Sequence, residues 1–246
     1  MNRKVIILKV GGAVVEDPVA LARLIQEFAA IEGAKVLVHG GGRSATAMAT
    51  RLGIETRMVD GRRITDDEML RVVTMVYGGL VNKTIVAQLQ AAGVNAMGLT
   101  GADADIIRSH IRTPRSWGWV GDVDSADGDR LATLIREGIV PVIAPLTHDG
   151  QGHILNTNAD TMAQTVACAL APQFQVSLRY HFEKRGVLCN PDDPESLIPR
   201  ITEADFGRLQ AEGIVSGGML PKLQNAFEAI RQGVSEVKIG ETSITA

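Results

Sequence analysis

Two clusters of glycine, each directly after an apolar segment, are the first residues of this chain whose pattern suggests chemistry. Gly11 and Gly12 follow the segment 5–10, which carries Lys9, and a run of three glycines at 40–42 follows a second apolar segment. Glycine lets backbone N–H groups approach an anion closely, and the start of a following helix adds a favourable dipole. A lysine in an apolar segment needs an anionic partner or a route to the surface. The pattern fits a phosphate site, although plain turns and a solvated lysine would produce it too.

Side chains that could hold a small anionic substrate lie in two further segments. The segment DGRRIT (60–65) is a turn with adjacent arginines, and Arg63 could grip a carboxylate through two parallel hydrogen bonds. The segment NTNAD (156–160) offers amides, among them Asn156, and the carboxylate of Asp160, which could orient cationic groups. A solvated turn and a helix N-cap are the structural alternatives for these two segments.

A glycine turn with a lysine shortly after it opens the last predicted helix. The segment SGGMLPK (216–222) places Gly217 and Gly218 before that helix and Lys222 one turn into it. This arrangement suits a phosphate cradle, whereas a capped surface helix with a solvated lysine would have the same pattern. The glycine clusters match neither GxxxxGK[ST] nor GxGxxG, so the sequence does not indicate a Walker-type NTPase or a dinucleotide enzyme.

The elements that must position these residues alternate between short β-branched segments and longer helical patterns. Unbroken apolar runs predict buried strands, and apolar residues three or four positions apart predict helices. The alternation predicts an α/β fold with a mainly parallel sheet, helices on both faces, and ligands at the carboxyl ends of the strands. We expect two tightly packed lobes, 1–172 and 173–246. Strands are predicted at 5–10, 35–40, 94–100, 139–143, 175–180, 187–189 and 236–240, and helices at 18–30, 43–52, 66–92, 128–137, 158–170 and 219–231.

Local patterns refine this prediction at four places. Gly78 and Gly79 weaken the long helix, and short strands joined by turns suit 103–123 better than a helix. The segment GQG (150–152) is typical of a hairpin turn. Thr202 is predicted as a helix N-cap, with Asp205 at the reciprocal position of a capping box.

The composition is that of a globular protein without bulk affinity for polyanions. The 246 residues can bury a sizeable core, and a formal net charge of -3 gives no general attraction to nucleic acid or to an anionic membrane. The apolar segment 5–10 is too short for a signal peptide, and no stretch reads as the roughly 20 apolar residues of a membrane helix. The isolated Cys168 and Cys189 fit a reducing compartment. We expect a cytoplasmic protein whose partners are small molecules, with no nucleic acid and no membrane among them.

In combination and order, these segments resemble the amino-acid kinase family over nearly the whole chain. The resemblance points to a three-layer αβα sandwich, with an N-terminal lobe that binds an N-acylglutamate and forms a homodimer, and a C-terminal lobe that binds ATP. The matching segments are ILKVGG (7–12), VLVHGGG (36–42), DGRRIT (60–65), VNK (81–83), GL (98–99), EGIVPVIAPL (137–146), NTNAD (156–160) and GGMLPK (217–222).

The resemblance implies a role for each candidate residue. Lys9 and Lys222 would flank the phosphoryl group in transfer from ATP, and Asp160 would orient both lysines. Arg63 would hold the substrate's α-carboxylate and Asn156 its N-acyl amide. Backbone N–H groups would face nucleotide phosphate at Gly11, Gly12, Gly217 and Gly218, and the substrate at Gly41 and Gly42. Mg²⁺ would act as cofactor, and no metal ligand is predicted in the chain itself.

The implied reaction is phosphorylation of the side-chain carboxylate of N-acetyl-L-glutamate, in arginine biosynthesis. A carboxylate is already ionised near neutral pH, so it needs no general base, and two lysines would offset the charge that spreads over the phosphoryl oxygens. The family's Ser-Asp motif is missing from the stretch 176–188, which carries Arg179, His181 and Glu183 instead. We therefore expect a nucleotide site that differs in detail. The family's N-terminal helix is not seen before 5–10, so we expect an arginine-insensitive homodimer.

Several other functions stay open from the sequence. Arg112 and Arg115, which lie near Trp117 and Trp119, could line a larger acyl pocket that holds the extra carboxylate of N-succinyl-L-glutamate. A carbamate, uridylate or glutamate 5-kinase would share the fold. A non-catalytic effector-binding protein on the same fold would account for the missing Ser-Asp motif, although the presence of both lysines and Asp160 argues against it.

Overall fold

The computed structural model describes residues 3–59, 61–181, 185–190, 192–215 and 219–245. Its largest sheet has eight strands in the order β12-β14-β13-β11-β1-β2-β8-β5. Every neighbouring pair in it is parallel except β13 and β14, so the prediction of a mainly parallel sheet is confirmed. The strands are β1 (Lys4–Val10), β2 (Ala34–His39), β5 (Ala96–Leu99), β8 (Val140–Ile143), β11 (Gln175–Tyr180), β12 (Arg200–Thr202), β13 (Glu236–Ile239) and β14 (Thr242–Thr245).

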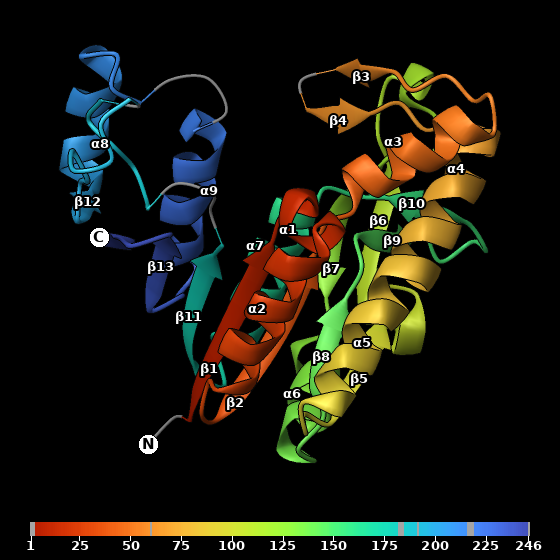
Figure 1. Ribbon diagram of the computed structural model, residues 1–246, viewed down its shortest axis with the longest axis horizontal. Helices are drawn as coiled ribbons and strands as arrows, with labels where there is room; N and C mark the ends of the chain where they lie inside the picture. The colour runs from red at the N-terminus through yellow and green to blue at the C-terminus, as the bar shows by residue number, and fades with distance from the viewer. Residues whose placement is uncertain (1–2, 60, 182–184, 191, 216–218, 246) are drawn as a thin grey trace.

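Helices cover both faces of this sheet and make it the middle of three layers, as expected (Figure 1). The helices are α1 (Gly12–Glu16), α2 (Pro18–Ala29), α3 (Gly42–Arg51), α4 (Asp67–Val73), α5 (Asn82–Ala91), α6 (Gly128–Arg136), α7 (Ala159–Leu170), α8 (Glu203–Ala211) and α9 (Met219–Arg231). The π-helix η1 (Thr74–Val81) joins α4 to α5, and η2 (Asp103–Asp105) and η3 (Arg115–Trp117) are short 3-10 turns. All six predicted helices are present, within a few residues of the predicted ends.

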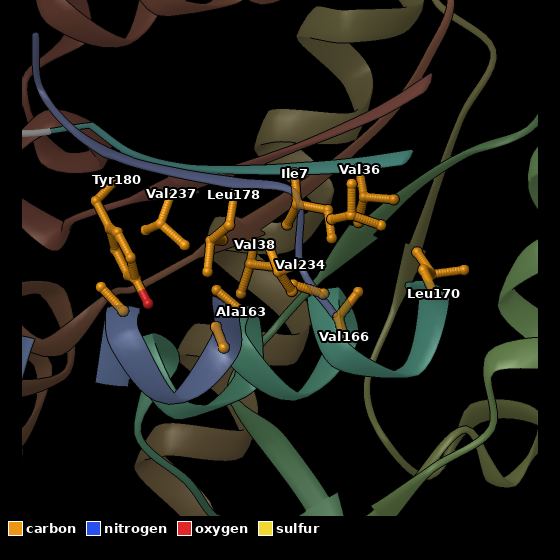
Figure 2. Close-up of a cluster of buried hydrophobic side chains, with 14 of the residues drawn as sticks. Ile7, Val36, Val38, Ala163, Val166, Leu170, Leu178, Tyr180, Val234 and Val237 are labelled. Carbon is orange, nitrogen blue, oxygen red and sulfur yellow. The ribbon is translucent and has the colours of Figure 1, made fainter. Parts of the chain in front are cut away.

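Two apolar cores lie on opposite faces of the sheet. On one face, inward side chains of β1, β2, β11 and β13 pack against α7, as Figure 2 shows for Ile7, Val38 and Leu178 above Ala163 and Val166. On the other face a second core joins α2 and the helices α4 and α5. Burial of both faces explains why the central strands are apolar without alternation.

A single long helix runs from Asp67 to Ala91, and its middle, η1, has π-helical hydrogen bonding around the predicted weak point at Gly78 and Gly79. By length and composition this 25-residue helix is apolar enough to cross a membrane, so the expectation that no such stretch exists is wrong. A core helix passes the same test, and here Val72, Val73 and Ile85 are buried in the second apolar core.

Capping residues start several helices where the sequence predicted. Thr202 accepts from the backbone of Asp205, whose side chain bonds back to Thr202, which completes the predicted capping box. Asn158 is the N-cap of α7, since its side chain accepts from the N–H groups of Asp160 and Thr161. Asp160 therefore falls in the first turn of α7 and its carboxylate is free for another role.

Two smaller sheets extend the molecule beyond the carboxyl edge of the large one. The four-stranded sheet has the order β10 (Ile154–Asn156), β9 (Leu146–His148), β6 (Ile107–Ile111) and β7 (Gly121–Ala126). It contains the irregular strands expected after residue 103 and the predicted hairpin turn between β9 and β10. The third sheet is the hairpin of β3 (Met58–Val59) and β4 (Arg62–Arg63), which the sequence reading missed.

The C-terminal part differs from expectation at two places. The strand predicted at 187–189 is a single bridge between Leu188 and Leu197 among the residues described there. The predicted last strand, β13, is followed by a further strand, β14, which runs antiparallel to it. β12 pairs with β14 and forms the edge of the sheet. The strand β11, from the predicted C-terminal lobe, lies directly beside β1, so both predicted lobes share one sheet.

Candidate active site

The two glycine turns meet backbone to backbone at the carboxyl edge of the sheet. The Gly40 N–H donates to Val10 O at 2.9 Å, which joins the ends of β1 and β2. A Cβ on Gly12 would lie 3.3 Å from Gly42 N and 3.6 Å from Gly41 N. The absence of a side chain at Gly12 therefore leaves these two amide groups uncovered at the start of α3, where an anion is favoured.

Next to these turns, Lys9, Asp160 and Lys222 form a cluster from three elements. Lys9 Nζ lies 2.7 Å from Asp160 Oδ1, and Lys222 Nζ lies 3.2 Å from Asp160 Oδ2. Lys9 is near the end of β1, Asp160 is in the first turn of α7, and Lys222 is in the first turns of α9. The two lysine side chains are 13% and 16% exposed and the carboxylate 28%, so the charges are sheltered without being sealed off. The structure thus brings the three predicted residues together, while their catalytic roles stay predictions.

The electrostatics of the cluster depend on one carboxylate between two ammonium groups. Burial alone would raise the pKa of Asp160, but the charges of Lys9 and Lys222 outweigh it and lower that pKa below its usual value. Burial lowers the pKa of Lys222, an effect that the Asp160 charge opposes and the Lys9 charge reinforces. Asp160 is therefore ionised at neutral pH and holds two cations that would otherwise repel each other.

A cavity beside the cluster is lined by all four residues predicted to bind the substrate. It lies between the Gly40–Gly42 turn, the β3–β4 hairpin and the start of α7. The lining residues are Gly40, Gly41, Gly42, Met58, Gly61, Arg62, Arg63, Tyr77, Val120, Pro145, Asn156, Thr157, Asn158 and Ala159.

Arg63 lies in the cavity wall but is already strongly held by the protein. Its Nη2 donates to Gly42 O at 2.7 Å and to Thr46 Oγ1 at 2.8 Å, and its Nη1 contacts Thr56 and Met69. Only Nε is buried without a partner among the residues described. The predicted two-bond grip on a carboxylate would need shared or exchanged hydrogen bonds, so this role stays a prediction.

The side chain of Asn156 lies in the cavity wall and is held there by Thr65, a contact that the sequence did not predict. Its Nδ2 donates to Thr65 Oγ1 at 2.9 Å, and Thr65 N and O bond the backbone of Trp117 and Trp119. A Cβ on Gly118, which has a φ of +72°, would lie 2.0 Å from Thr65 O, so only glycine lets the two tryptophans frame this contact. The Trp-Gly-Trp stretch thus supports the wall of this cavity.

Several residues at the site were not predicted. Tyr180, whose ring lies 4.7 Å from Lys222 Nζ, occupies the end of β11 near the missing Ser-Asp motif. Glu16 accepts from Ser44 N at the start of α3, and Tyr77 packs against Gly41. The sequence signal that could have indicated Tyr180 is its place at the carboxyl end of a predicted strand, where ligands are expected.

Other predicted residues lie elsewhere or outside the described part of the chain. Arg112 pairs with Asp122 at 2.5 Å, and Arg115 stacks on Trp119, so neither lines the cavity as the succinyl interpretation suggested. Gly217 and Gly218 fall outside the residues that the structure describes.

Comparison with known proteins agrees with this geometry. The profile of the amino acid kinase family matches residues 4–241. An acetylglutamate kinase of Bacteroides fragilis is 61% identical over 241 residues, which cover 97% of this chain and 92% of that protein. An acetylglutamate kinase of Methanopyrus kandleri is 41% identical over 95% of this chain and 93% of its own length.

A solved structure shows the same fold. The crystal structure of smu.665 from Streptococcus mutans UA159 has a TM-score of 0.81 and 26% sequence identity, and the match covers 98% of each chain. The matched fold, the family profile and the relatives together leave one conclusion. This chain is an enzyme of the amino acid kinase family.

Proposed function

We propose that this enzyme transfers the γ-phosphate of ATP to the side-chain carboxylate of N-acetyl-L-glutamate, as part of arginine biosynthesis. The observation that carries the proposal is the convergence of Lys9 and Lys222 on Asp160, beside two uncovered glycine turns. The names of the relatives support the choice of acceptor, because acetylglutamate kinases match nearly the full length of this chain.

In the proposed reaction, a carboxylate oxygen of the substrate attacks the γ-phosphorus and forms a new P–O bond. The bond from that phosphorus to the bridging oxygen breaks, and its electron pair leaves with ADP, so no proton has to move. Lys9 and Lys222 stabilise the charge on the phosphoryl oxygens, and Asp160 keeps both ammonium groups in place. The N–H groups of Gly41 and Gly42 contact the substrate, and those of Gly11 and Gly12 the nucleotide phosphates.

Mg²⁺ fits this scheme as a companion of the nucleotide. Among the residues that the structure describes, no group of three or more His, Cys, Asp or Glu side chains gathers in a form that could hold a metal. Mg²⁺ is commonly bound through one or two carboxylates together with substrate phosphates. Asp160 is the carboxylate at hand, and the ion would offset phosphate charge when bound.

We assign substrate binding to the lobe 1–172, ATP binding to 173–246 with Gly217 and Gly218, and the enzyme to the cytoplasm as a homodimer.

The homodimer is supported by an exposed apolar surface on the long helix 67–91. Met75 and Leu80 on this helix are 56% and 58% exposed, and a second copy of the chain would cover them. Light scattering should give twice the chain mass. A monomeric mass across the micromolar range would contradict the dimer without affecting the proposed reaction.

The reaction is tested by ADP release with Mg-ATP and a panel of acceptors: N-acetyl-glutamate, N-succinyl-glutamate, free glutamate, carbamate and UMP. We expect N-acetyl-glutamate to give the largest kcat/KM and trapping with hydroxylamine to reveal the acyl phosphate. Turnover only with carbamate or UMP, or none with any acceptor, would contradict the proposal. In the second case a binding role on the same fold would be favoured.

N-succinyl-glutamate is a second candidate because of Arg62. This residue lines the cavity next to Arg63, and burial followed by the charge of Arg112 lowers the pKa of its guanidinium. A second cation in the wall could pair with the extra carboxylate of a succinyl group. If succinyl is the acyl group, Arg62→Met should lower kcat/KM for the succinyl substrate far more than for the acetyl one. Equal effects on both would leave N-acetyl-glutamate as the substrate.

A further inference from the structure

A buried polar network lies directly behind the Gly40–Gly42 turn. His39, the last residue of β2, has no exposed surface, and its Nδ1 lies 2.7 Å from Gly40 O. On the other side of the ring, Nε2 lies 3.1 Å from Nδ2 of Asn82, the first residue of α5. Neither residue belongs to the reaction scheme above, so their function is unassigned.

The network fixes which nitrogen of His39 carries the hydrogen. Asn82 Nδ2 also donates to Val142 O at 2.9 Å, and Asn82 Oδ1 accepts from Lys83 Nζ at 3.2 Å. A carbonyl only accepts and an ammonium only donates, so the amide of Asn82 has one possible orientation. It therefore donates to Nε2 of His39, which leaves Nδ1 to carry the hydrogen and donate to Gly40 O.

The surroundings keep this arrangement rigid and the ring neutral. Lys83 Nζ also donates to Gly98 O at 3.1 Å, and a Cβ on Gly98 would lie 1.9 Å from Asn82 Oδ1. The strand β5 therefore needs glycine here to admit the network. Burial, assisted by the charge of Lys83, lowers the pKa of His39 to about 4, so the ring carries no charge at neutral pH.

Fixing the carbonyl of Gly40 also fixes the amide of Gly41. The two groups belong to one planar trans peptide and point in opposite directions. The N–H of Gly40 is itself tied to Val10 O at 2.9 Å, so this residue is held at both of its polar groups. The Gly41 N–H must then point away from the His39 ring, and Gly41 N lies close to the side-chain-free face of Gly12.

We propose that His39 is a positioning residue, whose Nδ1–H holds the Gly40–Gly41 peptide so that the Gly41 N–H meets the reacting anion. His39 touches no substrate and acts only through this peptide. The inference rests on the proposed function for the identity of the anion, but the peptide orientation can be tested without it. A misdirected amide would lower transition-state stabilisation more than ground-state binding, so kcat should fall and KM should hold.

The first test uses the wild-type protein. Long-range ¹H–¹⁵N correlation spectra at pH 7 should show His39 as the neutral ring with hydrogen on Nδ1. A ring that is charged, or that carries its hydrogen on Nε2, would overturn the proposal, since Gly40 O or Asn82 would then lack the partner described. This measurement needs neither a substrate nor a variant that folds.

The second test compares two variants of similar size that each keep half of the network. In His39→Asn the amide nitrogen occupies the place of Nδ1 and can still donate to Gly40 O. In His39→Gln the amide extends to the place of Nε2 and keeps only the contact with Asn82. We expect kcat to fall about 10- to 100-fold in His39→Gln and less than about threefold in His39→Asn, with little change in KM.

Thermal unfolding and ¹⁵N-glycine spectra complete the comparison. The midpoint of unfolding should drop similarly in both variants, and the Gly41 amide resonance should shift strongly only in His39→Gln. Equal losses of kcat that follow the loss of stability would mean a merely structural histidine. If wild type turns over no acceptor, the proposed reaction fails, yet the glycine spectra still decide whether His39 orients this peptide.

Discussion

The two sides of the candidate active site consist of different chemical groups. One side, which we call the amide side, consists of backbone N–H groups of Gly12, Gly41 and Gly42, backed by the buried and neutral side chains of His39 and Asn82. The other, the ionic side, consists of the charged side chains of Lys9, Asp160 and Lys222, which stay 13–28% exposed. The amide side depends on the absence of side chains at its glycines and on fixed peptide planes, whereas the ionic side depends on the balance of three charges.

This difference means that the two sides should fail in different ways. Removing a charge from the ionic side changes the electrostatics of the transition state and leaves most of the packing intact. Adding a methyl group to the amide side changes no charge but covers or displaces donors. Substitutions on the two sides therefore separate charge stabilisation from positioning, and the expected effects differ in size.

The largest effect is expected when the ionic side loses a lysine. Lys9→Ala removes an ammonium group that would stabilise the transferring phosphoryl group, and kcat should fall about 10²- to 10³-fold. Steady-state kinetics with Mg-ATP and the best acceptor would measure it, and circular dichroism should show an intact fold. Lys4→Ala, at the exposed opposite end of β1, is the matched control and should keep wild-type turnover. A Lys9→Ala enzyme within a few-fold of wild type would remove Lys9 from the mechanism.

A smaller effect is expected when the ionic side keeps its cations and loses the anion between them. Asp160→Asn leaves two ammonium groups in close proximity without a counter-charge, so both should shift, and kcat should fall up to about 10²-fold. The Asp160 charge raises the pKa of Lys222, so its removal should move the alkaline limit of activity to lower pH. A pH profile of kcat for both proteins measures this. An unchanged alkaline limit would show that Asp160 does not control the lysines.

The amide side should respond more mildly to a single methyl group. In Gly12→Ala the new Cβ would lie 3.3 Å from Gly42 N and 3.6 Å from Gly41 N, so both amides would be partly covered. We expect a loss of about tenfold in kcat/KM, since a small displacement at the reacting centre is enough to slow the reaction. Gly207→Ala, whose Cβ would meet nothing within 4 Å, is the control and should be neutral. Wild-type kinetics for Gly12→Ala would mean that no anion approaches these amides.

The smallest effect at neutral pH, but a clear one in acid, concerns stability. The pKa of His39 is about 4 in the folded protein against an unfolded value of 6.5, so the unfolded state binds the proton more readily. Stability is therefore fully present above pH 6.5 and declines as the pH falls towards 4. The loss between pH 7 and 4.5 should be roughly 2–3 kcal/mol. Urea unfolding at both pH values would measure it, and the decline should be much smaller in His39→Asn.

Local patterns in the sequence predicted most of the fold and some of the site. The unbroken apolar segment 5–10 predicts a buried strand, and the Thr202–Asp205 pair predicts a helix start, because each pattern acts within a few residues. The glycine clusters predict turns at strand ends for the same reason. The π-helical segment of the long helix was foreseen only as a weakness at Gly78 and Gly79, and its hydrogen bonding needs the packed neighbours.

Other features had no local signal. The β3–β4 hairpin has two residues in each strand, too few for a periodic pattern, and Met58, Arg62 and Arg63 of this hairpin line the cavity. The support of Asn156 by Thr65 joins residues 91 positions apart. Arg112 and Arg115 resembled acyl ligands in the sequence, but Asp122 and Trp119 engage them in the fold.

By itself, the sequence determined the alternation of strands and helices, the helix caps, and the glycine turns whose backbone amides no side chain covers. These follow from steric freedom and hydrogen bonding between neighbours along the chain. Only the tertiary structure decided that Lys222 meets Asp160 across 62 residues, and that His39 is neutral with its hydrogen on Nδ1. Charge balance and protonation depend on which groups the folded chain brings within a few ångströms and removes from water, and no local pattern contains that information.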